Sequence, residues 1–183
     1  MSRTASNEPV IMTMLMTPDL ANFSGKVHGG ALLKLLDQVA YACASRYSGN
    51  YAVTLSVDQV VFRQPIMVGE MVTFRARINF VGTTSMEVGI RVEAQNIKTK
   101  EVRHTNSCFF TMVAINDAGM TAKVPRLCLE SDKDRQRFIA GKLRRELRQQ
   151  HAAKLEEVKA QSRGKIEQLS AEELHAYLDG DKA

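Results

Sequence analysis

The stretch from Ser24 to Tyr47 constrains the fold more than any other part of this 183-residue chain. Its apolar residues recur at helical spacing and cover most of a helix circumference, which predicts one long, largely buried helix. They are Val27, Ala31, Leu32, Leu35, Leu36, Val39, Ala40, Ala42 and Cys43. A narrow polar stripe remains, formed by Lys34, Asp37, Gln38, Tyr41 and Ser45. The rest of the chain must supply a surface that covers this helix.

The helical pattern opens with Gly29-Gly30, behind a turn at Ser24-Gly25. Each glycine inside a helix costs about 1 kcal/mol relative to alanine, so this pair indicates that another group approaches the backbone closely. Free N–H groups and the positive end of the helix dipole suit an anion or a polarised carbonyl oxygen. Together with the carboxylate of Asp37 on the same helix, they form a candidate catalytic arrangement.

After the turn at Ser48-Gly49-Asn50 the hydrophobic period changes to two, which predicts β-strands. Four long strands are expected in hairpin succession, preceded by a short strand; they cover residues 53–63, 72–80, 86–94 and 102–115, and the short strand covers 10–16. The last one is apolar on both faces near Cys108, so it should be an interior strand. Short links favour antiparallel pairing, and one apolar face per strand must pack on the helix. The sequence thus predicts an α+β fold, a curved antiparallel sheet wrapped around one long helix.

The composition shifts at Ser131, after which Lys, Arg, Gln, Glu and Ala dominate. Residues 132–164 are predicted to form one long, exposed amphipathic helix, and a short last helix is expected from Ser170. We therefore divide the chain into a loose N-terminus (1–8), a central domain (9–129) and a helical C-terminal extension (130–183). The net charge of +5 lies partly on this extension. The segment lacks interleaved aromatic residues and contains acidic ones, which favours packing on another subunit over nucleic-acid binding.

Composition and missing motifs exclude several classes of protein. The three cysteines form no C-x-x-C pair, so free thiols in a reducing compartment are expected. The first residues contain no apolar signal-peptide core, and no apolar run could span a bilayer. The four histidines show no metal-binding spacing, and neither a phosphate-binding P-loop nor a G-x-S-x-G motif is present. These features predict a cytoplasmic protein that binds neither metal nor membrane.

Several blocks, in order and spacing, carry a resemblance to a known family: MTMLMTPDLANFSGKVHGGALLKLLDQVAYACASRY, TLSVDQVVFRQPIMVGE, GTTSMEVGI and RHTNSCFFTMVA. They resemble the hotdog-fold acyl-CoA thioesterases, specifically the bacterial acyl-CoA hydrolases related to the brain cytosolic enzyme, over residues 9–127. The resemblance implies hydrolysis of fatty acyl-CoA to a free fatty acid and coenzyme A. It implies no metal or redox cofactor, since coenzyme A is part of the substrate and the product.

The resemblance also implies a catalytic pair, an asparagine in the loop before the helix and an aspartate within it. These correspond to Asn22 and Asp37. In the family, two sheets join edge to edge in a dimer, and each site takes the asparagine from one protomer and the aspartate from the other. Three dimers commonly form a hexamer, so a homohexamer is expected.

The chemistry of these residues fits the implied reaction. The Asp37 carboxylate can take a proton from the attacking water, which we prefer, or attack the thioester carbonyl itself to form a mixed anhydride. The Asn22 amide can orient the water or bind the carbonyl oxygen, although asparagine is also common in loops. The backbone N–H of Gly29 or Gly30 is a candidate donor to that oxygen as it gains charge, and His28 can bind the thioester region or only cap the helix.

Arg63, Thr84 and Ser85 are candidates for binding coenzyme A, whose phosphates favour basic and hydrogen-bonding groups. Arg103 is expected to be solvated or at a subunit contact. Five apolar residues are candidates for the acyl pocket: Val53, Leu55, Phe62, Phe80 and Met86. Cys108, in a strand that is apolar on both faces, is expected to be a buried and unreactive thiol.

Two other functions remain open from the sequence. One is a hotdog enoyl-thioester hydratase or dehydratase, in which His28 and Asp37 would act together on one side of the helix. The other is a non-catalytic acyl-CoA sensor, in which the basic C-terminal helix would contact a partner or DNA.

Overall fold

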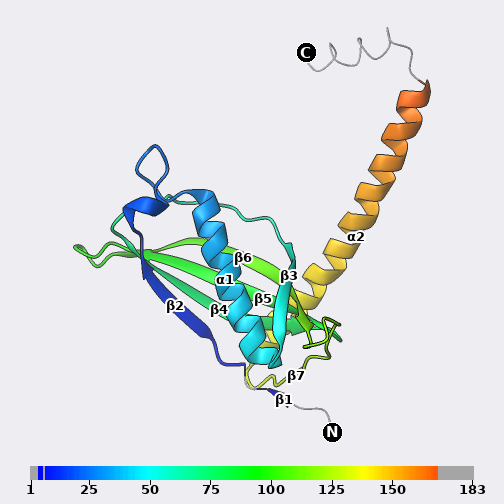
Figure 1. The fold of residues 1–183 in the computed structure, drawn as a ribbon, viewed down its shortest axis with the longest axis horizontal. Coiled ribbons are helices and arrows are strands. Elements are labelled where there is room, and N and C mark those ends of the chain that lie inside the picture. Colours follow the sequence, from blue (N-terminus) through cyan, green and yellow to red (C-terminus); the bar gives the residue numbers. More distant parts are fainter. Residues whose placement is uncertain (1–3, 6, 169–183) are drawn as a thin grey trace. The chain divides into compact units, whose positions relative to one another are not determined.

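A computed structural model describes residues 4–5 and 7–168, and its main feature is an antiparallel sheet that curls around helix α1 (Figure 1). In the sheet the strands lie in the order β2-β4-β5-β6-β3, while β1 and β7 form a separate parallel pair. The elements are β1 (Thr4–Ala5), β2 (Val10–Leu15), the 3-10 helix η1 (Pro18–Leu20), α1 (Gly29–Ser48), β3 (Tyr51–Val57), β4 (Met71–Val81), β5 (Ser85–Gln95), β6 (Val102–Ile115), β7 (Arg126–Leu127) and α2 (Asp132–Gln168). The expected α+β architecture is confirmed.

Helix α1 begins at Gly29, which confirms that the helix opens with the glycine pair; the residues before it in the stretch from Ser24 are not helical. His28 is the N-cap, with extended backbone angles, and its Nδ1 accepts a hydrogen bond from the Gly30 N–H. Residues 24–28 instead belong to a loop in which Gly25 takes a left-handed conformation, with φ of 72°. At the other end the helix stops at Gly49, which is also left-handed and caps it through a bond to the Ser45 carbonyl.

The core lies between α1 and the concave face of the sheet. One face of β4, β5 and β6 is fully buried against the apolar side of the helix, as the alternating pattern predicted. The largest of these buried apolar side chains are Phe74, Ile78, Met86, Ile90, Phe110 and Met112. Strand β6 lies between β5 and β3, which confirms that it is an interior strand.

The predicted succession of hairpins was wrong at its first link. Strand β3 ends at Val57 and pairs with β6, and residues 58–70 then cross without regular structure to the start of β4. A tight hairpin needs a connection of about two to five residues, and this longer segment carries Pro65 as well. Residues 60–63, which were expected to continue this strand, therefore lie in the irregular segment, called the 58–70 crossover below.

The two faces of β3 are also reversed relative to the expectation. Ala52 is buried, and the Thr54 side chain is turned toward α1, where it bonds to Asp37. Val53 and Leu55 instead lie on the face of β3 that points away from α1, and 67% of Leu55 is exposed. The exposed apolar side chains of this edge strand therefore do not pack on α1, and they are available to a surface outside this chain.

The predicted long C-terminal helix is confirmed as α2, whereas the short helix expected from Ser170 lies outside the described residues. The compact unit that holds the sheet runs to Gly141, so it includes the first turns of α2. There the Phe138 ring packs on Phe80 with centroids 5.1 Å apart, and a Cβ on Gly141 would lie 2.7 Å from the Phe80 Cβ. Phe80 thus contacts α2, not the pocket described below.

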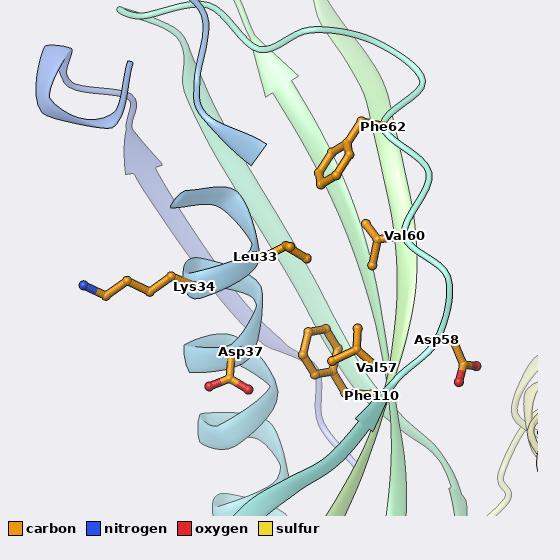
Figure 2. Close-up of a pocket in the computed structure, with 8 residues that line it drawn as sticks. All are labelled: Leu33, Lys34, Asp37, Val57, Asp58, Val60, Phe62 and Phe110. Carbon is orange, nitrogen blue, oxygen red and sulfur yellow. The ribbon is translucent and has the colours of Figure 1, made fainter. Parts of the chain in front are cut away.

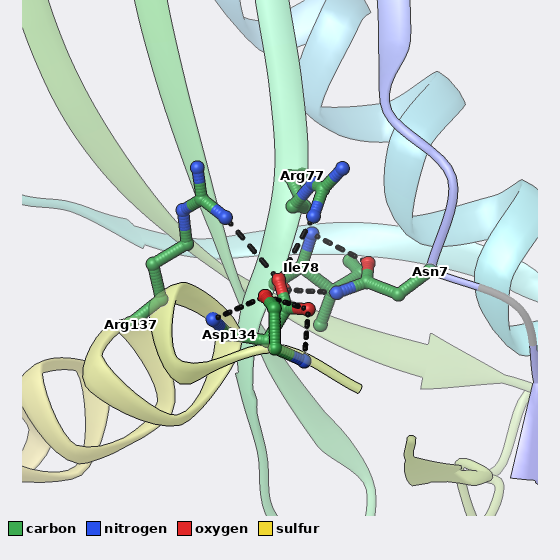
Figure 3. Close-up of polar contacts among 6 residues, drawn as sticks. Asn7, Arg77, Ile78, Asp134 and Arg137 are labelled. Atoms are coloured by element: carbon green, nitrogen blue, oxygen red, sulfur yellow. Dashed lines mark hydrogen bonds and ion pairs between the residues drawn. The ribbon is translucent and has the colours of Figure 1, made fainter. Parts of the chain in front are cut away.

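Asp134, in the first turn of α2, gathers several donors (Figure 3). Its carboxylate accepts bonds from the Ser131 hydroxyl at 2.6 Å and from Arg77 of β4 at 2.9 Å, with Arg137 at 3.2 Å. Nearby, the Asn7 side chain bonds to the backbone of Ile78. The hydrogen bonds from Ser131 are the main cause that lowers the pKa of Asp134 below its usual value of 3.8.

We expect Asp134→Asn to lower the free energy of unfolding by about 1–2 kcal/mol at pH 7, because it weakens a helix cap and two ion pairs. A lowered carboxyl pKa stabilises the fold fully above the unfolded value, and this contribution is lost as the pH falls through the folded value. The difference between wild type and variant should therefore be constant from pH 7 to about 5 and shrink below 4. Urea denaturation across this range measures it, and a constant difference down to pH 2 would contradict the assignment.

Candidate active site

Asp37 lies on the open side of α1, and its Oδ1 accepts a hydrogen bond of 2.5 Å from the Thr54 hydroxyl. The Thr54 hydroxyl also lies 3.4 Å from the sulfur of Met112 on β6. The bond between Thr54 and Asp37 fixes one carboxylate oxygen of Asp37 against β3. Sequence reasoning missed Thr54, because a threonine at an alternating strand position is expected to face solvent until the strand's orientation is known.

A pocket of about 570 Å³ adjoins Asp37 (Figure 2). Its walls are mainly apolar and come from α1, the end of β3, the 58–70 crossover and β6. The lining residues are Leu33, Lys34, Asp37, Val57, Asp58, Val60, Phe62 and Phe110. Figure 2 shows the Asp37 carboxylate beside Val57 and Phe110, whereas the Asp58 carboxylate is turned away from the helix. The pocket can hold an apolar chain with one carboxylate at its side.

The two glycines at the start of α1 differ as backbone donors. The Gly30 N–H is occupied, because it donates to His28 Nδ1 at 2.9 Å. Within residues 4–5 and 7–168, the Gly29 N–H has no hydrogen-bond partner. The Phe62 ring lies beside it, 3.7 Å from where a Cβ on Gly29 would be. Of the two glycines, Gly29 is therefore the one whose N–H is available to a carbonyl oxygen.

Asn22 organises the loop that precedes α1. Its Oδ1 accepts bonds from the Ser24 N–H at 2.9 Å, the Ser24 hydroxyl at 2.8 Å and the Lys26 N–H at 3.1 Å. Its Nδ2 donates to no described residue. The side chain thus serves the loop with its oxygen and still has an amide group free to bind a ligand.

The predicted site residues do not converge within one chain. Asp37 lies eight residues after Gly29, which is about 12 Å along a helix axis. Arg63 is exposed in the crossover, whose end pairs with the loop before α1. Ser85, next to Thr84, pairs with Val113 near the start of β3, at the opposite end of α1. One chain therefore presents the expected site in three separate pieces.

Comparisons with known proteins agree with this architecture. Residues 24–101 match the thioesterase superfamily. The chain is 47% identical to Protein VdlD of Helicobacter pylori over 145 residues, which cover 79% of this chain and 83% of that one. It is 30% identical to the uncharacterized acyl-CoA thioester hydrolase YkhA of Bacillus subtilis, covering 73% and 77%. The chain belongs to the thioesterase superfamily.

A solved structure supports the assignment of this chain to the thioesterase superfamily. The crystal structure of an apo-hexameric acyl-CoA thioesterase superimposes with a TM-score of 0.76 at 31% identity, covering 79% of this chain and 93% of that one. The expected hotdog fold is thereby confirmed. Among the described residues, no helix has the length and apolar character needed to cross a membrane.

Two of the three cysteine thiols of this protein are buried and unreactive. Cys43 and Cys108 are buried, and burial raises the pKa of each to about 12. A thiol must ionise to act as a nucleophile, so neither can serve at neutral pH. Cys128 is exposed.

We expect one of the three thiols to react quickly with an aromatic disulfide reagent in the native protein, and all three after unfolding. Cys128→Ser should remove the fast phase, because the remaining thiols stay protonated and inaccessible. Absorbance of the released thiolate gives the stoichiometry. A fast native reaction of Cys108 would contradict the assignment of this thiol as buried and unreactive.

Proposed function

We propose that this protein is an acyl-CoA thioesterase that hydrolyses fatty acyl-CoA to a free fatty acid and coenzyme A. The observation that carries the proposal is the hydrogen bond between Thr54 and Asp37 at the wall of an apolar pocket. The apolar walls suit an acyl chain, and the carboxylate lies where the polar thioester would end that chain. The names of YkhA and of the hexameric thioesterase support the substrate class.

In the proposed reaction, Asp37 removes a proton from a water molecule as the water attacks the thioester carbonyl. The carbon–sulfur bond then breaks, and the thiolate of coenzyme A leaves and takes up a proton. The Thr54 hydroxyl holds Oδ1 of Asp37, which leaves Oδ2 available to the water. The Gly29 N–H would stabilise the charge that develops on the carbonyl oxygen.

A related enzyme supports the pairing of Asp37 with Thr54. An acyl-CoA hydrolase from Staphylococcus aureus, 26% identical, has been solved with an aspartate replaced by alanine and with a threonine replaced by alanine. In that protein the two positions are 17 residues apart. Asp37 and Thr54 have the same separation here and are hydrogen-bonded to each other.

Direct attack by Asp37, which would form a mixed anhydride, is the alternative mechanism at the same site. Single-turnover hydrolysis in ¹⁸O-labelled water distinguishes the two routes, because only the anhydride can transfer an oxygen of Asp37 to the fatty acid. Neither route calls for a metal or redox cofactor.

We infer that a complete site needs a second copy of the chain, which would supply Asn22 and Gly29 to the Asp37 of its partner. The separation of about 12 Å between Gly29 and Asp37 in one chain supports this inference. So do the free edge and exposed apolar face of β3. The hexameric relative supports three such dimers per assembly, in which Arg63, Thr84 and Ser85 would bind coenzyme A from different protomers.

The hydratase alternative receives no support from the geometry. Within one chain His28 and Asp37 are nine residues apart, about 14 Å along the helix axis, so this pair too would need a second copy of the chain. His28 Nδ1 is also engaged with the Gly30 N–H.

A cytoplasmic location is part of the proposal. It is supported by the rat enzyme named cytosolic acyl coenzyme A thioester hydrolase, which is 35% identical over 70% of this chain and 34% of that one.

Asp37→Asn should lower kcat by at least about a thousandfold while the assembly stays intact, because the amide cannot accept the proton from water. Release of free thiol from acyl-CoAs of short to long chain measures the activity and the chain preference together. Asp58→Asn is the matched change at the other carboxylate of the pocket, and it should retain most of the activity. A dead Asp58 variant and an active Asp37 variant would move the base to Asp58. No release from any acyl-CoA by wild type would favour the sensor.

Mixing Asn22→Ala with Asp37→Asn protomers tests the shared site. Each variant alone should be nearly inactive, whereas a mixed dimer carries one site with both native residues. After subunit exchange by mild denaturation and refolding, about a quarter of the wild-type activity per dimer should return, because random pairing makes about half of the dimers mixed and each of these has one native site out of two. Native mass spectrometry verifies that mixed dimers form. If they form and remain inactive, the two residues act within one chain.

A further inference from the structure

One ion pair holds the end of the 58–70 crossover against β6. Arg103 of β6 donates to both carboxylate oxygens of Glu70, at 2.6 and 2.7 Å. The Glu70 side chain is only 8% exposed and that of Arg103 26%. Hydrogen bonding from Arg103 is the main cause that lowers the pKa of Glu70, so the pair stays ionised. Arg103, expected to be solvated or at a subunit contact, instead makes a bidentate bond within the chain.

The same two side chains also bind the backbone of the crossover. Arg103 Nη2 donates to the Pro65 carbonyl at 2.7 Å, and Glu70 Oε2 accepts from the Met67 N–H at 2.9 Å. Between these points, the Ile66 carbonyl accepts a bond from the Val27 N–H at 2.8 Å. The ion pair therefore joins β6 to the end of the crossover, and the Val27–Ile66 backbone bond links that end to the loop that carries Asn22.

The middle of the crossover has little else to fix it. The Asp58 N–H bonds to the Phe109 carbonyl, but within the described part of the chain residues 59–65 make no backbone–backbone hydrogen bond. This middle part nevertheless contributes Val60 and Phe62 to the pocket wall, and the Phe62 ring lies against Gly29. The position of that wall thus depends on the anchors at the two ends of the crossover.

We propose that Glu70 and Arg103 are positioning residues that set the acyl-chain selectivity of the site, because their ion pair holds the Phe62 wall over the pocket and beside Gly29. This proposal rests on the proposed hydrolysis of acyl-CoA. Neither side chain lines the pocket, so both act through the crossover. Loss of one partner would leave a largely buried charge without its counter-ion, and the crossover would move to hydrate it.

The test compares Glu70→Gln with Asp134→Asn. Both replace a carboxylate of an arginine ion pair with its amide, but Asp134 joins α2 to β4 and touches neither the pocket nor the crossover. We expect Glu70→Gln to flatten the chain-length profile, so that the ratio of kcat/KM between the best and the poorest acyl-CoA falls by about tenfold. Asp134→Asn should keep the wild-type ratio. If Glu70→Gln does not fold, Arg103→Lys, which keeps the charge but not the bidentate bond, replaces it.

Hydrogen exchange supplies a readout that does not depend on activity. Amides of residues 58–69 and 20–30 should exchange faster in Glu70→Gln and at the wild-type rate in Asp134→Asn. Unchanged exchange in these segments, or a chain-length ratio altered equally in both variants, would overturn the proposal. Faster exchange in Glu70→Gln, combined with no hydrolysis of any acyl-CoA by wild type, would overturn the role in selectivity and the proposed function, and would leave the ion pair as a structural anchor only.

Discussion

Burial of the apolar surface of α1 is the constraint on which the rest of this structure depends. Each Leu or Val side chain of this helix that is fully removed from water contributes about 1.5–3 kcal/mol, and the helix carries Leu32, Leu35, Leu36 and Val39 on one buried side. A flat sheet could cover only a narrow stripe, so the sheet must curl to enclose the helix (Figure 1). The length and curvature of β4, β5 and β6 follow from that requirement.

The same constraint determines where the chemistry can occur. The buried side of α1 has no room for a carboxylate, whose transfer from water without a partner would cost several kcal/mol. Asp37 therefore lies on the open side, where the Thr54 hydroxyl of β3 reaches it. An edge strand can both cover the helix and leave one side of it open. The candidate site lies where the sheet stops covering the helix.

The sequence predicted the helix, the strands and the interior position of β6, because these depend on local periodicity. It did not predict that β3 pairs with β6, since pairing over about sixty residues leaves no local pattern. Nor did it predict the orientation of β3, because an edge strand with one apolar face can turn that face either way. Thr54 was missed for this reason. The partner of Arg103 was missed because Glu70 is 33 residues away in sequence.

Asn22 and Gly29 lie far from Asp37 within one chain, so the site depends on what covers the exposed edge strand β3. Val53 and Leu55 of β3 expose apolar side chains on an unpaired edge, a combination that soluble proteins normally cover. A second copy that paired with this edge would remove water from the surroundings of Asp37. Exclusion of water strengthens the electrostatic interactions on which proton transfer and charge stabilisation depend. Assembly would then do more than add Asn22 and Gly29: it would create the low-dielectric environment in which the Asp37–Thr54 pair can act on a thioester.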